Sequence, residues 1–200
     1  ILTGTIRRQP FVVSMIPPPS ESLKARLSRP ISAITAYDYP SARFCDEAGI
    51  QLILVGDSLG MVVAGNEDTT SVTLEQIIYH TEMVRRGVTR AVILSDLPIN
   101  TYRDPAEALK NGLRLIKAGA DAVKLEGGLG QIEKVKALTS EGIPLCAHVG
   151  MLPQRVIEEG GYKKKGKTDA EARSLIEASL ALEEAGAFAI VLESVVGEVA

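Results

Sequence analysis

The sequence predicts an α/β fold in which a parallel sheet closes into a (β/α)8 TIM barrel, and three observations support this fold. Short apolar runs alternate with amphipathic stretches from Ile31 onward, and no hairpin signal joins neighbouring runs. A polar or charged residue follows nearly every apolar run, which places chemistry where parallel strands end. No Gly-x-Gly-x-x-Gly motif follows the first run, so an open dinucleotide-binding sheet is disfavoured.

The predicted strands are short apolar runs bounded by turn residues. The second of them is the clearest, because four consecutive apolar residues suit a strand that is covered on both faces. In chain order the predicted strands are Ile31–Ala36, Leu52–Val55, Ala91–Leu94, Ala122–Glu126, Leu145–Ala147 and Ala189–Leu192.

Helix start and stop signals separate these strands. Thr73 with Gln76 predicts a capping box, and so does Asp104 with Glu107. The helix after Asp104 is expected to place Leu109, Leu113 and Ile116 on one apolar face. The predicted helices run from Ser41 to Ala48, Thr73 to Gly87, Asp104 to Gly119, Ile132 to Gly142 and Thr168 to Gly186.

The residues at the strand ends favour the barrel. A barrel brings all of its strand ends to one face, whereas an open sheet uses only those near its switch point. In chain order these residues are Asp38, Asp57 with Ser58, Asp96, Lys124 with Glu126, His148 and Glu193.

Six strands fall short of the eight that a barrel needs, and such a barrel usually takes about 250 residues. We therefore expect a barrel truncated after strand six, or a longer full polypeptide. The expected organisation is an N-terminal arm over residues 1–30, poorly ordered or a targeting extension, and one barrel domain over residues 31–200.

The amino-acid composition argues against some classes of binding partner. A net charge of −3, a pI near 5.5 and the absence of Trp argue against nucleic acid. No apolar run approaches the roughly 20 residues of a membrane span, so no membrane partner is expected. Cys45 and Cys146 have no metal or redox spacing and are expected to be buried thiols in a reducing compartment. The expected location is the cytoplasm, or the mitochondrial matrix if the Arg-rich N-terminus is a transit peptide.

Asp57 and Asp96 end neighbouring strands and predict a metal site. Two carboxylates brought close together raise each other's pKa unless a cation lies between them. Oxygen ligands without nearby His or Cys favour Mg²⁺ over Zn²⁺, and Glu126 is expected to complete the ligands directly or through water. Lys124 points to the same side as Glu126 by strand periodicity, and its ammonium suits a substrate carboxylate.

A site of this kind suits a small 2-oxo acid that chelates Mg²⁺ and loses an adjacent proton to form an enolate. Glu193 is the expected base, because its neighbours Leu192 and Val195 are apolar and such an environment raises a carboxylate's pKa. His148 is a possible accessory residue that binds a carboxylate or the substrate. A purely structural role for His148 is equally open.

Seven segments together resemble the ketopantoate hydroxymethyltransferase family, from about residue 31 to the end. They are residues 34–39 (ITAYDY), 54–60 (LVGDSLG), 123–128 (VKLEGG), 147–150 (AHVG), 152–154 (LPQ), 160–162 (GGY) and 191–193 (VLE). The resemblance implies a barrel of the phosphoenolpyruvate/pyruvate type. It also implies an enzyme that transfers a hydroxymethyl group from 5,10-methylenetetrahydrofolate to 3-methyl-2-oxobutanoate, giving ketopantoate for pantothenate synthesis.

The same resemblance implies roles for individual residues. The Mg²⁺ ligands fall on Asp57 and Asp96, with Glu126 beside the metal, and the proton acceptor falls on Glu193. The substrate-binding residues fall on Asp57, Ser58, Asp96 and Lys124. The partners implied are the 2-oxo acid, the folate and further copies of the chain, because members of the family form homo-oligomers, often decamers.

Some segments depart from the family's usual wording. Residues 194–196 read Ser-Val-Val instead of Cys-Val-Pro, and residues 66–71 lack the usual His-Asp-Thr-Thr-Leu-Pro. Residues 163–165 are three lysines, which fit either a solvated loop or a contact with the folate's glutamate tail. The family's seventh strand, Gly-Ile-Gly-Ala-Gly in character, is not present.

Two alternatives remain open from the sequence. One is a Mg²⁺-dependent lyase or mutase of the phosphoenolpyruvate mutase and isocitrate lyase group. That group generally uses a nucleophilic Cys or a phosphate-binding loop, and neither is evident here. The other is a catalytically inactive truncated barrel that only binds the 2-oxo acid.

Overall fold

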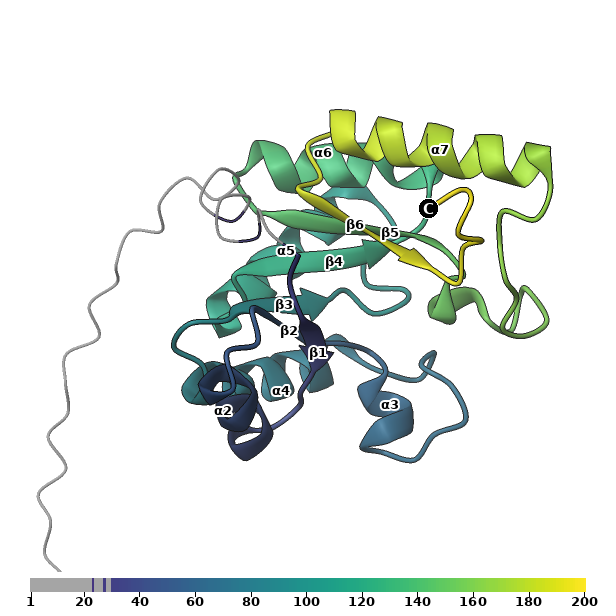
Figure 1. Cartoon of the computed structure of the whole chain (residues 1–200). Helices are drawn as coiled ribbons and strands as arrows, with labels where there is room; N and C mark the ends of the chain where they lie inside the picture. The colour runs from purple at the N-terminus through teal and green to yellow at the C-terminus, as the bar shows by residue number, and fades with distance from the viewer. Residues whose placement is uncertain (1–22, 24–26, 28–29) are drawn as a thin grey trace, which may run out of the picture.

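One parallel sheet forms the centre of the computed structural model, which describes Leu23, Leu27 and residues 30–200. Its strands lie side by side in chain order, and Figure 1 shows the sheet curling with helices on its outer side. The predicted parallel α/β fold is thereby confirmed. The strands are β1 (Ala33–Thr35), β2 (Leu52–Val55), β3 (Val92–Asp96), β4 (Ala122–Glu126), β5 (Leu145–Gly150) and β6 (Ala189–Glu193).

The helices lie close to their predicted positions, with one addition. The short helix α3 (Leu59–Val62) follows the end of β2 and was not predicted. The others are α2 (Tyr39–Glu47), α4 (Leu74–Gly87), α5 (Pro105–Ala118), α6 (Ile132–Ser140) and α7 (Asp169–Glu184). Two 3₁₀ helices, η1 (Leu129–Gln131) and η2 (Pro153–Arg155), follow β4 and β5.

The predicted capping boxes are confirmed in one case and half-formed in the other. At α4 the Thr73 hydroxyl accepts from the Gln76 backbone, and the Gln76 side chain accepts from the Thr73 N–H. At α5 the Asp104 carboxylate caps the helix. The Glu107 carboxylate accepts from the Arg103 N–H instead of closing the box.

The predicted apolar face of α5 is not buried at one position. Leu113 is 51 % exposed, whereas its neighbour Gly112 is buried against α6. A Cβ at Gly112 would lie 2.5 Å from Leu138 Cδ2, so the absent side chain lets the two helices approach closely. The helix therefore turns its small residue toward its neighbour and its leucine outward.

Side chains along each strand alternate between two apolar clusters. The inner cluster, on the concave side of the sheet, includes Leu52, Val92, Leu94, Ala122, Cys146 and the isolated Leu23. The outer cluster packs under the helices and includes Ile53, Ile93, Val123, Leu125 and Ala147. The alternation places Lys124 and Glu126 on the inner side with Ala122. The inner face of the sheet is therefore apolar toward the strands' starts and charged toward their ends.

The predicted division into an arm over residues 1–30 and a barrel over residues 31–200 stays a prediction, because most of the first range lies outside the described residues. Both cysteines are free thiols; Cys146 is buried as expected and Cys45 half-buried. Within the part of the chain that the structure describes, no helix is both long and apolar enough to cross a membrane.

Candidate active site

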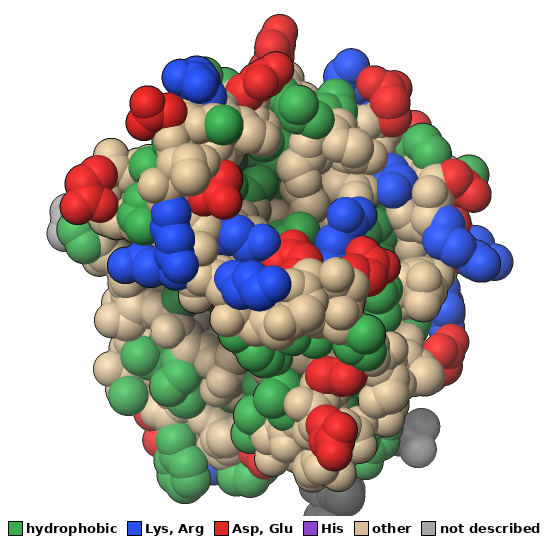
Figure 2. Space-filling view, turned by 90° about the vertical axis from the view of Figure 1, so that its right-hand side faces the viewer, with side chains coloured by type: hydrophobic (Ala, Val, Ile, Leu, Met, Phe, Trp, Pro, Cys, Tyr) green, Lys and Arg blue, Asp and Glu red, His purple; other side chains and the backbone are tan. Residues whose placement is uncertain are grey.

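The pairing of neighbouring strands brings the charged strand ends together. Asp96 at the end of β3 is in register with Lys124 of β4, and Glu126 is in register with His148 of β5. Figure 2 looks onto this side of the molecule and shows acidic and basic side chains on its surface, beneath which these four residues are buried. The strand register thus explains why residues far apart in the sequence face one another.

Asp57 follows β2 by two residues and lies directly against Asp96. Its backbone N–H donates a 3.0 Å hydrogen bond to Oδ2 of Asp96, and both side chains are buried. Gly56 makes this approach possible, since a Cβ there would lie 3.3 Å from Asp96 Oδ2 and 3.0 Å from Ser58 Oγ.

Lys124 is the cation at the centre of the cluster. Its Nζ lies 2.9 Å from Asp96 Oδ1 and 3.5 Å from Glu126 Oε1, and all three side chains are at least 96 % buried. The ammonium predicted to receive a substrate carboxylate is therefore already paired with protein carboxylates.

The charges of this cluster do not balance, and the pKa values reflect this. Burial, together with the charges of Asp96 and Glu126, raises the pKa of Asp57 to about 7. Burial also raises the pKa of Asp96, although Lys124 opposes the shift. Three buried carboxylates against one ammonium leave an excess of negative charge, which either a proton or a further cation relieves.

His148 connects the cluster to Glu193. Its Nδ1 lies 3.2 Å from Glu126 Oε1 and its Nε2 lies 3.3 Å from Glu193 Oε2, although the latter contact is out of line for a hydrogen bond. Burial lowers the pKa of His148, but the two glutamates outweigh burial and the net shift is upward. The Glu193 carboxylate is 38 % exposed, Leu192 is also exposed, and the apolar surroundings expected for this base are not found.

Ser58 contacts Tyr37, which lies two residues after the end of β1. Its Oγ lies 2.7 Å from the Tyr37 hydroxyl, and the Tyr37 carbonyl contacts Nδ1 of His80 at 2.6 Å. Asp38, by contrast, is exposed and caps α2 by accepting from the Ser41 N–H. Its contact is therefore with a helix end.

Two buried residues without a predicted role complete the cluster. Gln154 in η2 donates from Nε2 to Asp57 Oδ2 at 2.8 Å, and Tyr102 hydrogen-bonds Gln154 Oε1. Gln154 belongs to one of the motifs that carried the resemblance, but its contact with Asp57 spans 97 positions. No local pattern in the sequence signals such a contact.

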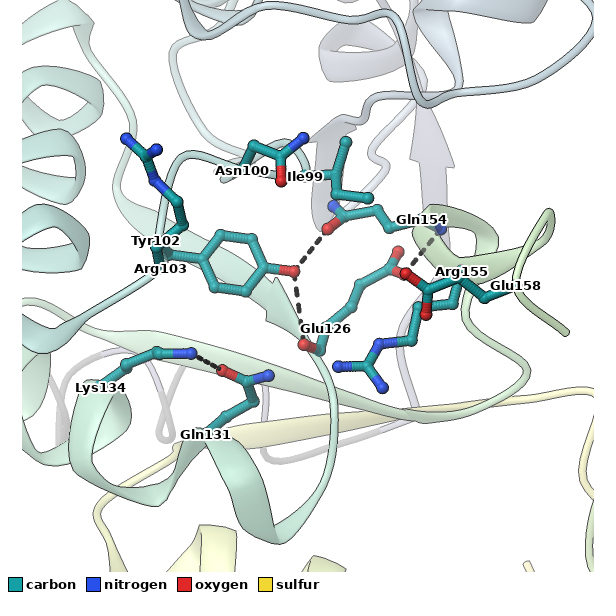
Figure 3. A pocket seen from close by; sticks show the side chains of 10 residues that line it. All are labelled: Ile99, Asn100, Tyr102, Arg103, Glu126, Gln131, Lys134, Gln154, Arg155 and Glu158. Carbon is teal, nitrogen blue, oxygen red and sulfur yellow. Dashed lines mark hydrogen bonds between the residues drawn. The ribbon is translucent and has the colours of Figure 1, made fainter.

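Tyr102 and Gln154 also line a hollow of about 190 Å³ (Figure 3). Tyr102, Gln154 and Glu126 form its inner wall, and its rim carries Arg103, Lys134 and Arg155. Lys134 is bonded to Gln131 and Arg103 to Glu107, so both of these rim cations already have partners.

The donor set suits Mg²⁺ in part. Among the described residues no three His, Cys, Asp or Glu side chains stand ready as a metal site, since Lys124 lies between Asp96 and Glu126. Asp96 Oδ1 is buried and, apart from its ion pair with Lys124, has no hydrogen bond among the described residues. Mg²⁺ is commonly held by one or two carboxylates, with water and substrate in its other positions. Asp57 and Asp96 are the two carboxylates that suit such an arrangement, and the predicted part of Glu126 in it stays a prediction.

The three lysines of residues 163–165 are not equivalent. Lys163 Nζ donates to the Glu159 carbonyl and Lys165 Nζ pairs with the Glu159 carboxylate, while Lys164 is exposed. Two of the three are therefore bound within their own loop, and a contact of this loop with the folate tail stays a prediction.

The fold and the site together define an α/β-barrel protein with acids and a lysine at the strand ends. Solved structures with this fold include phosphonopyruvate hydrolase in complex with oxalate and Mg²⁺, with a TM-score of 0.68 and 17 % identity. That match covers 88 % of this chain and 62 % of the other. A 2,3-dimethylmalate lyase of the PEP mutase/isocitrate lyase superfamily matches with a TM-score of 0.64 and 20 % identity, covering 90 % and 64 %. At these identities the likeness concerns the fold alone.

The chain belongs to the ketopantoate hydroxymethyltransferase family, whose sequence profile matches residues 20–200. The 3-methyl-2-oxobutanoate hydroxymethyltransferase of Pyrococcus abyssi is 47 % identical over 183 residues, which are 91 % of this chain and 65 % of that protein. The enzyme of the same name from Caldivirga maquilingensis is 51 % identical over 174 residues, 86 % and 66 % of the two chains. This chain thus spans about 65 % of the length of the relatives it matches. The family resemblance read from the sequence is confirmed.

Proposed function

We propose that this protein transfers a hydroxymethyl group from 5,10-methylenetetrahydrofolate to 3-methyl-2-oxobutanoate, giving ketopantoate, the first step of pantothenate synthesis. The observation that carries the proposal is the buried cluster of Asp57, Asp96, Lys124 and Glu126 at the strand ends, in a chain of this family. In the overall reaction the C3–H bond breaks and a bond forms from C3 to the one-carbon unit. That unit leaves the folate nitrogens, and water supplies the hydroxyl.

Each of these side chains has a role in the proposal. Asp57 and Asp96 hold Mg²⁺, with Glu126 beside it. When bound, Mg²⁺ supplies Lewis acidity that stabilises the enolate of the 2-oxo acid. The half-buried Ser58 hydroxyl and the Lys124 ammonium orient the carboxylate and keto group of the substrate. An ammonium has three donors, so Lys124 can keep Asp96 and Glu126 and still offer one to the substrate.

Glu193 is proposed to accept the proton from C3. Its carboxylate is partly exposed at the mouth and lies beside His148, whose own pKa is raised. In this proposal the ring of His148, whose Nε2 lies 3.3 Å from Glu193 Oε2, orients the Glu193 carboxylate. His148 therefore acts as an accessory residue that orients the base.

The assay that tests the proposal measures tetrahydrofolate release from methylenetetrahydrofolate and the 2-oxo acid, with and without Mg²⁺. Exchange of the C3 proton in D₂O, followed by NMR, isolates the first step. Glu193→Gln is expected to slow this exchange by about 10²- to 10⁴-fold. Exchange at the unsubstituted rate in Glu193→Gln would remove Glu193 as the base.

The lyase or mutase alternative is favoured less. The solved structures that support it share at most 20 % identity among those described above, whereas the transferase relatives share 47–51 %. Cleavage of an isocitrate-type substrate by the protein would revive it. Binding of the 2-oxo acid without any folate-dependent product would favour the inactive barrel.

We further propose a homo-oligomer, a decamer by analogy with the family, and a cytoplasmic location. Exposed apolar side chains such as Ile34, Phe44 and Val62 support association of copies, and the free thiols suit a reducing compartment. Light scattering after gel filtration gives the oligomer number, and a monomer would contradict the first proposal. Cell fractionation tests the second.

A further inference from the structure

We propose that Gln154, held in place by Tyr102, is a positioning residue that fixes the Asp57 carboxylate so that one of its oxygens faces the metal position. This inference rests on the proposed function, because it assigns Asp57 to the metal. Nothing in the motif Leu-Pro-Gln indicates this role by itself. It follows from four contacts that the Gln154 side chain and backbone make inside the cluster.

The orientation of the Gln154 amide is determined by its neighbours. Its Nε2 lies 2.8 Å from Asp57 Oδ2 and 3.0 Å from the Leu97 carbonyl oxygen. Both partners accept hydrogen bonds, so the nitrogen and not the oxygen must face them. The two hydrogens of the amide nitrogen are then both used, and its oxygen points the opposite way.

Tyr102 completes the arrangement from that opposite side. Its hydroxyl contacts Gln154 Oε1, and the carbonyl oxygen of Glu126 lies 3.4 Å from the same hydroxyl (Figure 3). The hydroxyl can donate to the amide oxygen, so this contact agrees with the orientation that Asp57 and Leu97 impose on the amide. Gln154 and Tyr102 are 3 % and 9 % exposed, so these contacts are largely buried.

The backbone of Gln154 holds a second carboxylate. Its N–H donates to Glu126 Oε2 at 3.1 Å, while Oε1 of the same carboxylate faces Lys124 and His148. Gln154 therefore contacts one oxygen of Asp57 and one of Glu126. No hydrogen bond to Asp57 Oδ1 is found among the described residues, and this oxygen remains for the metal.

The two oxygens of Asp57 therefore have different roles: Oδ2 accepts from Gln154, and Oδ1 is the oxygen proposed to face the metal. Oδ2 accepts a hydrogen bond from a neutral amide, which restrains the plane of the carboxylate without adding charge. Outer contacts of this kind typically change metal affinity by about 10- to 100-fold when removed. A glutamate at position 154 would have nearly the same size as glutamine, but it would replace the amide donor with a carboxylate. Asp57 would then face a third negative charge besides Asp96 and Glu126.

The experiment measures the Mg²⁺ dissociation constant by calorimetry, without substrate, for the unsubstituted protein and for Gln154→Met, Gln154→Glu and Tyr102→Phe. Gln131→Met is the matched control, since Gln131 is also buried and lines the same hollow without contacting these carboxylates. The KM for the 2-oxo acid and the melting temperature are recorded for every variant.

We expect Gln154→Met to raise the Mg²⁺ dissociation constant about 10- to 100-fold, with Gln154→Glu the larger change and Tyr102→Phe a smaller one. Gln131→Met should leave it unchanged. If Gln154→Glu does not fold, Gln154→Met and Tyr102→Phe decide. Unchanged Mg²⁺ affinity in a folded Gln154→Met, or a lower melting temperature as its sole effect, overturns the inference while the proposed function stands. An unsubstituted protein that neither binds Mg²⁺ nor exchanges the C3 proton overturns both.

Discussion

The ammonium of Lys124 lies 2.9 Å from Oδ1 of Asp96, and both side chains are almost completely buried. Each member of such a buried pair depends on the other, because burying one of the two charges without its partner costs several kcal/mol of free energy. Glu126 and Asp57 add further negative charge around the same ammonium, which raises the pKa of Lys124 although burial alone would lower it.

Lys124→Met is therefore expected to destabilise the protein by about 3–5 kcal/mol, since it leaves buried carboxylates without their cation. Added Mg²⁺ should recover part of this loss by occupying the same negative cluster. Urea unfolding with and without Mg²⁺ measures both effects. Lys136→Met, which breaks the exposed pair with Glu133, should cost less than about 1 kcal/mol. Equal losses in the two variants would contradict the prediction.

Gly56→Ala is expected to lower activity without a large loss of stability. The new Cβ would lie 3.3 Å from Asp96 Oδ2 and 3.0 Å from Ser58 Oγ, so the site residues must shift by a few tenths of an ångström. A displacement of 1 Å costs roughly 100-fold in rate, and a shift of this smaller size should cost about 3- to 10-fold. Gly130→Ala, where a Cβ meets nothing within 4 Å, is the control. The comparison of kcat for the two variants checks the prediction.

Asp46 should contribute stability that depends on pH. Burial opposes its charge, but N–H donors of Ala91, Arg90 and Thr89 and the Thr89 hydroxyl outweigh burial and lower its pKa. A lowered carboxyl pKa gives stability that is fully present above the unfolded value of about 3.9 and is lost as the pH falls through the folded value.

Asp46→Asn is accordingly expected to cost about 1.5–3 kcal/mol at pH 7. The difference from the unsubstituted protein should shrink as the pH falls below about 4. Unfolding free energies measured from pH 7 down to pH 3 test this. Glu141→Gln, at an exposed position, should show no such trend. A difference that stays constant with pH would exclude the electrostatic explanation.

Much of the fold could be predicted because its signals are local. The strands β2 and β4 have the predicted bounds, and the capping box of Thr73 and Gln76 forms as expected. The shared face of Lys124 and Glu126 follows from the two-residue period of a strand. The family resemblance was also readable, since it rests on short ordered motifs.

The rest depended on contacts between distant segments. Gln154 reaches Asp57 and Asp46 caps the backbone before β3, and neither contact leaves a pattern along the chain. The expected apolar setting of Glu193 rested on its sequence neighbours, whereas its side chain meets His148 from the adjacent strand. Hydrophobic periodicity also misplaced Leu113, because a close helix contact at Gly112 determined how α5 is turned.

Gly112→Ala is expected to destabilise the protein by about 1–3 kcal/mol through overpacking against Leu138, even though alanine favours helices. Leu113→Ala should change stability by less than about 0.5 kcal/mol in the single chain, because its side chain is exposed. Thermal unfolding of both variants makes the comparison. A larger loss from Leu113→Ala would mean that another copy of the chain covers this leucine.

The alternation along β4 separates two kinds of substitution by their physical effect. Ala122, Lys124 and Glu126 face the interior of the curl, whereas Val123 and Leu125 pack under the helices. A substitution at Val123 or Leu125 would therefore act on the packing under the helices, whereas one at Lys124 or Glu126 would act on the buried charges. One short strand thus offers engineers two sets of positions, one for adjusting stability and one for adjusting the site.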